Sequence, residues 1–426
     1  MTAHRRFRRC HLSRLVEEDL KGLSPIQTIM KMTEDDSIRA LGLDPANVIS
    51  FGGGWCNHIA PEALREAYKE IIEDTQLFHQ SGRYSPIVGD SLCREQLCRF
   101  EEHIFGLKNL EPRNILLGQS STQLFQDVLR VVCDPGEPIG FLDPTYANYR
   151  NAVKCALQHS KMLFLPALDP TEWTYLADPE AALEQLKQSC EKGLRMLVIP
   201  VPDNPTSQIP SDEFLRSALE IMQDACGYLL LDHAYKELWF GDMPKCFSWS
   251  PVDNPNLITV HTNSKWLSSL GRRLGWVEAD ASIISGFEKV NESVILSPDT
   301  LHSMTTARFL QRTLQEKSLR SYIEETRRLY EKTAQVMISA IDMHLGWKRL
   351  MPQGGLYTSC PTPANEDPVR FVERILKETG VLLIPGIGFG PSMEHAVRIS
   401  YGPLCYEHDH IREGIERIGK YLGTAH

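Results

Sequence analysis

The sequence lacks any apolar run as long as a membrane-spanning helix needs, which is about 18 residues or more. It also lacks the apolar segment that follows the charges of a secretory signal. We therefore expect a cytoplasmic protein with no membrane partner. The arginine-rich stretch before Glu17 is interpreted as a solvated basic arm, and a mitochondrial presequence stays as the alternative. Its arginines are Arg5, Arg6, Arg8, Arg9 and Arg14.

A basic excess is absent as well. The chain of 426 residues has 45 Lys and Arg against 55 Asp and Glu, which gives a formal net charge of −10. Proteins that bind nucleic acids usually carry a basic excess. We therefore expect no nucleic acid among the partners of this protein.

The sequence also lacks a regular spacing of its cysteines. The chain has 11 cysteines, an odd number, and no two of them form a Cys-x-x-Cys pair. A disulfide scaffold is therefore not expected in a chain of this length, and no spacing typical of a zinc site occurs. The pattern predicts reduced thiols, an intracellular compartment and no bound metal.

The middle of the chain alternates short apolar runs with amphipathic stretches. Several runs are apolar on consecutive residues, which is typical of strands buried on both faces. The alternation predicts an α/β fold with a mostly parallel sheet covered by helices, two of them at 122–132 and 179–192. The runs are 115–117, 139–142, 162–165, 196–201, 228–231, 257–260 and 275–278.

The last third of the chain has a different pattern and predicts a second, smaller α+β domain. One long helical stretch covers 305–345, two further helices are expected at 367–379 and 409–422, and an apolar run lies at 381–385. We expect an N-terminal segment (1–50) that packs with the small domain. A large domain (51–296) and the small C-terminal domain (297–426) complete the predicted organisation.

Polar residues follow successive strands of the predicted sheet, where ligands bind in α/β folds. Ser120 or Ser121 is a candidate N-cap of a helix whose free N–H groups suit a phosphate. Each loop alone has a plain explanation as a turn, a cap or a solvated charge. Together they supply partners for an aromatic cofactor with a phosphate, a pyridine nitrogen and an aldehyde. The other residues of the set are Tyr146, Asn204, Asp232, Tyr235, Thr262, Lys265 and Arg273.

This ordered set resembles the class I/II aminotransferases, which are pyridoxal 5′-phosphate (PLP) enzymes of fold type I. The resemblance runs from about Ser24 to the end of the chain. It implies a large domain with a mostly parallel seven-stranded sheet between helices, and a smaller α+β domain. The matching motifs are Asn204-Pro205-Thr206, Asp232-x-Ala234-Tyr235, Ser264-Lys265 followed by Arg273, Pro385-Gly386-x-Gly388-Phe389-Gly390, and Val397-Arg398-Ile399-Ser400, where x is any residue.

The resemblance implies roles around the cofactor. Lys265 would hold PLP as a Schiff base, and its freed amine would move the α-proton of the substrate. Asp232 would keep the pyridine nitrogen protonated. Tyr235 and Asn204 would hydrogen-bond the 3-oxygen of the ring, and Tyr146 would stack on its face. The phosphate would be held by Ser120, Ser121, Thr262 and Arg273.

The resemblance also implies how substrate is bound and how subunits assemble. Arg398 would clamp the α-carboxylate with its planar fork, and Gly54 would let the backbone approach that group. Asn204 and Trp55 complete the expected substrate contacts. Tyr84 would reach the phosphate of a neighbouring subunit, which implies a homodimer with shared active sites.

Three positions depart from the family pattern. Ser207 stands where the family usually has glycine, and Gln119 where a small residue is common; both are interpreted as tolerated variation. The third departure is Trp55-Cys56-Asn57-His58. Trp55 and His58 either shape an unusual pocket or are a packed aromatic and a surface histidine, and the sequence leaves both open.

The predicted function is transfer of the amino group of an L-amino acid to a 2-oxo acid. Elimination, replacement, cyclisation or oxidation on the same scaffold stay open, because all need Lys265, Asp232 and Arg398 and differ only after deprotonation. A PLP-domain transcription regulator is disfavoured, since no helix-turn-helix motif precedes Gly52 and Lys265 is present. The residues do not name the amino donor or acceptor.

Overall fold

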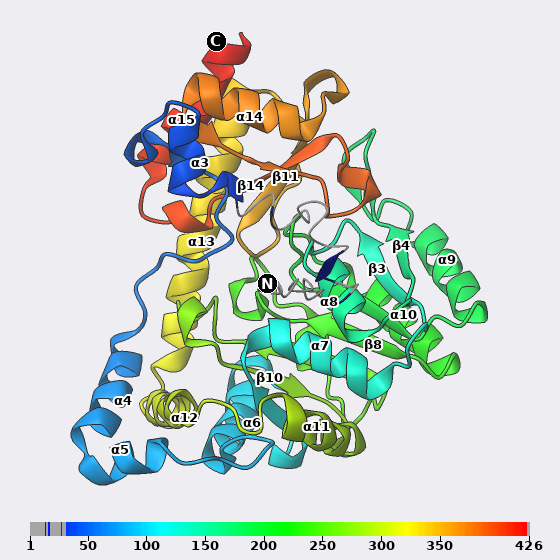
Figure 1. The fold of residues 1–426 in the computed structure, drawn as a ribbon, viewed down its shortest axis with the longest axis vertical. Coiled ribbons are helices and arrows are strands. Elements are labelled where there is room, and N and C mark those ends of the chain that lie inside the picture. Colours follow the sequence, from blue (N-terminus) through cyan, green and yellow to red (C-terminus); the bar gives the residue numbers. More distant parts are fainter. Residues whose placement is uncertain (1–12, 14–15, 18–26, 28–30, 424–426) are drawn as a thin grey trace, which may run out of the picture.

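The computed structural model describes residues 31–423 together with Ser13, Val16, Glu17 and Gln27, so the N-terminal arginines lie outside the described residues. A seven-stranded sheet forms the centre of the molecule (Figure 1), with the strand order β2-β10-β9-β8-β7-β3-β4. Every neighbouring pair is parallel except those of β10, which runs antiparallel to β2 and β9. No helix of the described part of the chain is long and apolar enough to cross a membrane.

All seven predicted strands are present, with boundaries shifted by two residues at most. Except in β4 at the edge of the sheet, their side chains are buried on both faces over most of their length, which explains the runs of consecutive apolar residues. The strands are β2 (Ile115–Gly118), β3 (Ile139–Asp143), β4 (Met162–Pro166), β7 (Met196–Pro200), β8 (Tyr228–Asp232), β9 (Leu257–Thr262) and β10 (Gly275–Glu278).

Helices cover both faces of this sheet. One face packs on α6 (Ser91–Phe105), α9 (Pro179–Glu191), α10 (Asp212–Asp224) and α12 (Thr300–Gln315) through one apolar core. The opposite face packs on α7 (Ser120–Val132), α8 (Tyr149–Ala156) and α11 (Ala281–Val294) through a second core. The result is the three-layer arrangement that buries a mostly parallel sheet.

The single long helix predicted at 305–345 is wrong. The structure has two helices there, α12 and α13 (Leu319–His344), separated by a break at Lys317, whose φ of 59° lies in the left-handed region. The two helices pack on different partners: α12 on α6 and α4 (Glu62–Glu73), and α13 on α15 (His408–Leu422). Each helix buries one face, the two faces are out of phase, and the break falls in the polar run 315–318.

The C-terminal part contains a small antiparallel sheet in the order β11-β14-β13. Its strands are β11 (Tyr357–Pro361), β14 (Ala396–Ser400) and β13 (Ile384–Pro385), and α14 (Pro368–Thr379) and α15 pack nearby. These two helices confirm the expected ones. The apolar run at 381–385 is split, because β12 (Val381–Leu382) pairs instead with β1 (Ile49–Ser50). Figure 1 shows α3 (Asp35–Ala40), α14 and α15 gathered at one end of the molecule and α4 at the other.

A buried ion network anchors the loop that follows β8. The Nζ atom of Lys236 lies 2.5 Å from Oε2 of Glu101 on α6, and both side chains are fully buried. His261 and Glu278 lie beside this pair, with 3.5 Å between the His261 Nε2 and the Glu278 carboxylate. Glu101, His261 and Glu278 have the composition of a metal site, but the ammonium of Lys236 already supplies positive charge there. The network therefore ties α6 to the loop that carries Tyr235.

Candidate active site

One cavity of about 330 Å³ opens at the carboxyl ends of the central strands, within the size range of small-molecule sites. All predicted site residues except Tyr84 line it, although they come from distant parts of the chain. The predicted residues in its lining are Gly54, Trp55, Ser120, Ser121, Tyr146, Asn204, Asp232, Tyr235, Thr262, Lys265, Arg273 and Arg398.

Lys265 lies just after β9 and extends its amine into this cavity. Its Nζ donates a hydrogen bond to the carbonyl oxygen of Gly54 at 2.5 Å and lies 5.4 Å from the ring centre of Tyr235. Among the described residues, no carboxylate forms an ion pair with it. The amine is therefore held at the cavity by a neutral acceptor and is available to an aldehyde.

Asp232 is the last residue of β8 and is buried. The hydroxyl of Tyr149 donates to Oδ2 at 2.7 Å, and the N–H of Ala234 donates to Oδ1 at 3.0 Å. Burial raises the pKa of the Asp232 carboxyl, while these two hydrogen bonds and the charge of Lys265 oppose the rise. Sequence reasoning missed Tyr149, which is the first residue of α8 and lies three residues after Tyr146.

Three hydroxyl groups and an arginine form a cluster on one side of the cavity. Thr262 Oγ1 lies 3.1 Å from the Ser120 hydroxyl and 2.9 Å from that of Ser264, and Arg273 Nη1 lies 3.4 Å from Ser264. This cluster stands beside the first turn of α7, where free N–H groups favour an anion. Ser264 was missed by sequence reasoning, although it directly precedes Lys265.

The expectation that Ser120 or Ser121 caps α7 is wrong. Gln119 occupies the N-cap position, and its side chain makes no capping hydrogen bond. Ser120 has a φ of 72°, which turns its hydroxyl toward Thr262 rather than toward the helix. Gly275 of β10 makes room for this turn, since a Cβ there would lie 2.9 Å from the Cα of Ser120.

Arg398 projects from β14 and is 5% exposed. Its Nη1 donates to Oδ1 of Asn204 at 3.1 Å and its Nη2 to the carbonyl of Gly52 at 2.8 Å, while Nε has no partner. No acid within the described part of the chain forms an ion pair with it. A buried guanidinium without a carboxylate is costly, so this group is suited to an anionic ligand.

Ser207, which replaces the usual glycine, has a φ of 56°. This left-handed conformation is the reason glycine suits the position, and serine adopts it at some cost in strain. The serine compensates with its hydroxyl, which accepts a hydrogen bond from the N–H of Tyr357 at 3.0 Å. The departure therefore preserves the turn after Asn204 and links it to β11.

Trp55 and His58 have different environments. Trp55 is 43% exposed and lines the cavity. His58 is 5% exposed and lies outside the cavity lining, with Nδ1 2.9 Å from the hydroxyl of Tyr330 and Nε2 3.1 Å from the carbonyl of Trp266. Burial lowers its pKa to about 4. Both interpretations of His58 are therefore wrong: it is neither a surface residue nor part of the pocket.

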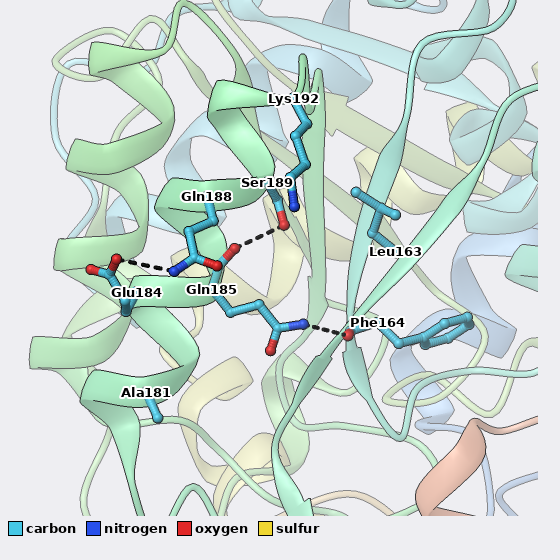
Figure 2. Close-up of a pocket in the computed structure, with 8 residues that line it drawn as sticks. All are labelled: Leu163, Phe164, Ala181, Glu184, Gln185, Gln188, Ser189 and Lys192. Atoms are coloured by element: carbon cyan, nitrogen blue, oxygen red, sulfur yellow. Dashed lines mark hydrogen bonds between the residues drawn. The ribbon is translucent and has the colours of Figure 1, made fainter.

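A second hollow lies between α9 and β4, at the edge of the sheet (Figure 2). It contains none of the predicted site residues. Its polar side chains mostly bond to their neighbours: Gln185 donates to the carbonyl of Phe164 at 3.4 Å, and Gln188 donates to Glu184 at 3.3 Å. We therefore assign the chemistry to the cavity around Lys265.

One family of known proteins matches a part of the chain that includes every residue of this cavity except Thr33. A model for aminotransferase class I and II matches residues 46–418. The chain belongs to the class I and II aminotransferases. Enzymes of this family depend on PLP and exchange an amino group between an amino acid and a 2-oxo acid.

Relatives of this aminotransferase are similar over nearly their whole length. The aspartate/prephenate aminotransferase of Thermus thermophilus is 26% identical over 95% of this chain and 98% of that protein. LL-diaminopimelate aminotransferase 2 of Nostoc is 24% identical over 90% of this chain and 92% of that protein. A solved structure of Thermus thermophilus aspartate aminotransferase with maleate has a TM-score of 0.81 at 24% identity, covering 97% and 100% of the two chains, and shows that the fold is shared.

Proposed function

We propose that this aminotransferase binds PLP at Lys265, anchors the α-carboxylate of an L-amino acid at Arg398 and passes the amino group to a 2-oxo acid. The observation that carries the proposal is the convergence in one cavity of Lys265, Asp232 and Arg398, whose guanidinium has no ion-pair partner among the described residues. These three groups come from the two sheets and match the aldehyde, the ring nitrogen and the substrate carboxylate.

The residues of the cavity fit the cofactor. The carboxyl of Asp232, oriented by Tyr149, would face the ring nitrogen and hold a proton there. The hydroxyls of Ser120, Thr262 and Ser264, with Arg273, would hold the phosphate, and Ser121 stands at the same helix start. When bound, PLP supplies an electron-withdrawing ring that makes the α-proton of an attached amino acid acidic.

The protein would move that proton with the amine of Lys265. The hydroxyl of Tyr235 lies 2.6 Å from that of Tyr357, and burial raises the pKa of Tyr235 well above its usual value, so Tyr235 stays neutral and can donate. Asn204, held by Arg398, would complete the contacts to the 3-oxygen of the ring, and Tyr146 would cover the ring face.

The two parts of the chain would close on the substrate together. Lys265 and Asp232 belong to the large sheet and Arg398 to the small one, so a carboxylate held by Arg398 would bridge the proposed large (51–296) and small (297–426) domains. A contact already joins them beside the cavity, because Asp143 accepts hydrogen bonds from the N–H and hydroxyl of Ser392 at 3.0 and 2.9 Å.

The test of transamination is a half-reaction on the holoenzyme with single amino acids. We expect the visible absorbance of bound PLP to be replaced by that of the pyridoxamine form, with one equivalent of 2-oxo acid and no ammonia. Addition of a 2-oxo acid should then restore the first spectrum. Release of ammonia, or a spectrum that no 2-oxo acid restores, would instead identify elimination or another reaction and overturn the proposal.

Replacing Arg398 with lysine should weaken amino-acid binding by one to three powers of ten, which is roughly 1.5–4 kcal/mol, because a lysine cannot form the two-pronged contact. Bound PLP should be retained. The measurement is a substrate titration of the PLP-bound variant. Arg412→Lys on the exposed face of α15 is the matched control and should bind substrate normally. Unchanged substrate affinity in Arg398→Lys would remove Arg398 from the site.

We further propose that the enzyme is a homodimer. Tyr84 is 82% exposed and lies outside the cavity, and the neighbouring segment also exposes Ile59, Ile72 and Phe78. Exposed apolar side chains on one segment are typical of a protein–protein interface. A second copy of the chain would cover them and place Tyr84 near its phosphate cluster.

Replacing Tyr84 with phenylalanine should weaken PLP binding about tenfold, by the loss of one hydrogen bond to a charged group, and change substrate affinity less. PLP titration of the apoenzyme measures the first effect. Tyr421→Phe on α15 is the control, since that exposed tyrosine lies on another part of the molecule. A protein that sediments as a monomer with full activity would rule out the shared site.

A cytoplasmic location also remains part of the proposal. All ten described cysteines are free thiols, several of them buried. Free thiols in this number are typical of a reducing compartment. Cell fractionation with the full chain tests the location, and the mitochondrial alternative predicts recovery with the organelle.

A further inference from the structure

The charged side chains that line the cavity are few. Among the described residues in its lining they are Asp232, Lys265, Arg273 and Arg398. Under the proposed function each of them already has a partner: the ring nitrogen, the aldehyde, the phosphate and the α-carboxylate. Among the described lining residues of one chain, no cation is left for a second carboxylate and no acid is left for a basic side chain.

Arg273 cannot take over the role of a second cation. Its Nη1 donates to the carbonyl of Leu270 at 2.5 Å and lies 3.4 Å from the Ser264 hydroxyl, so it is turned toward the hydroxyl cluster. Arg398, in contrast, lies beside aromatic rings, 4.5 Å from the ring centre of Tyr357 and 5.3 Å from that of Phe389. The surroundings of the carboxylate anchor are therefore aromatic rather than charged.

Trp55 adds an aromatic surface that the surrounding residues leave partly uncovered. Its ring lies against the backbone of Gly53, where a Cβ would come within 2.7 Å of the ring and of Pro403. The tryptophan is nevertheless 43% exposed and lines the cavity, so part of its ring faces the space where a ligand would lie. An apolar group that covers exposed apolar area of this kind stabilises the complex.

We infer that the enzyme takes amino acids with an apolar or aromatic side chain in preference to dicarboxylic ones, with Trp55 as a specificity-determining residue. The inference rests on the proposed anchoring of the α-carboxylate at Arg398. A second carboxylate would have to be desolvated in this cavity without a cation to pair with. An aromatic side chain would instead cover Trp55 and the rings beside Arg398.

The experiment measures binding of unreactive acids to the holoenzyme by calorimetry, so that it does not depend on turnover. The acids are 3-phenylpropionate, succinate and propionate. We expect 3-phenylpropionate to bind at least about tenfold more tightly than succinate. Succinate that binds as tightly as 3-phenylpropionate, or more tightly, would overturn the inference. The ammonia assay described above tests transamination separately, so the two proposals can fail independently.

Two variants test the role of Trp55. Trp55→Ala should reduce the ratio of 3-phenylpropionate to propionate affinity by about tenfold, whereas Trp55→Phe, which keeps a ring, should preserve most of it. Trp55→Arg should raise succinate affinity relative to propionate, because it supplies the missing cation. A ratio that is the same in Trp55→Ala and in the unchanged enzyme would remove Trp55 from the specificity site.

Discussion

Replacing Lys265 with alanine should abolish covalent attachment of PLP and lower the transamination rate by about four powers of ten or more, which is roughly 5.5 kcal/mol. The loss is expected because one amine performs two tasks: it holds the cofactor and it moves the α-proton. The variant should still fold, since Lys265 makes no ion pair with any described residue and its main polar contact is the carbonyl of Gly54. Borohydride reduction followed by peptide mass analysis measures the attachment, and stopped-flow absorbance measures the rate.

Two other lysines serve as controls for this experiment. Lys192 lines the hollow beside α9, so Lys192→Ala should keep both the adduct and the activity. Lys236 lies near the site in sequence but is buried against Glu101 and is absent from the cavity lining, so it should carry no PLP. A reducible adduct on any lysine in the Lys265→Ala variant would show that the assignment is wrong.

Replacing Asp232 with alanine should reduce turnover by about three powers of ten or more, roughly 4 kcal/mol, and should weaken PLP binding. No other acid lines the cavity among the described residues, so none can take over the protonation of the ring nitrogen. The bound cofactor should then lose the absorbance of its protonated ring. Single-turnover rates and PLP spectra over a range of pH values measure the two effects.

Tyr149→Phe is the matched control, because it removes the 2.7 Å hydrogen bond to Asp232 and keeps the carboxylate. That bond opposes the effect of burial on Asp232, so its loss should raise the pKa of the carboxyl further. The variant should be impaired about tenfold or less. A fall of less than tenfold in Asp232→Ala itself would contradict the assigned role.

The strands could be predicted because most residues of a central strand are buried and are therefore apolar. In β7 and β8 both faces are covered by helices, and the sequence consequently shows unbroken apolar runs at 196–201 and 228–231. The helix at 305–345 could not be divided in the same way. The four polar residues 315–318 do not by themselves mark a loop, and the break is evident only from the left-handed φ of Lys317 and from the packing of α12 and α13 on different partners.

The candidate site likewise contains residues that the sequence indicates and residues that only the tertiary structure brings to the cavity. Lys265, Asp232 and Arg398 could be selected from the sequence because they occur in ordered motifs whose spacing resembles a known family. Tyr149 and Tyr357 lie in no such motif, and Ser264 and Phe389 lie in motifs but were assigned no role, yet all four line the same cavity. Tyr149 reaches Asp232 because α8 packs over the large sheet, and Phe389 reaches Arg398 because β13, which precedes it, pairs with β14 in the small sheet.

By itself, the sequence determined the class of fold, because local burial patterns repeat along the chain, and the family resemblance of its ordered polar loops determined the cofactor. Only the tertiary structure decided that His58 is buried beside Tyr330, that Ser120 turns toward Thr262, and that Arg398 has no acid partner among the described residues. These features depend on contacts between residues far apart in sequence. Pairing, burial and missing charge compensation are properties of the space around a side chain, which its neighbours along the chain do not specify.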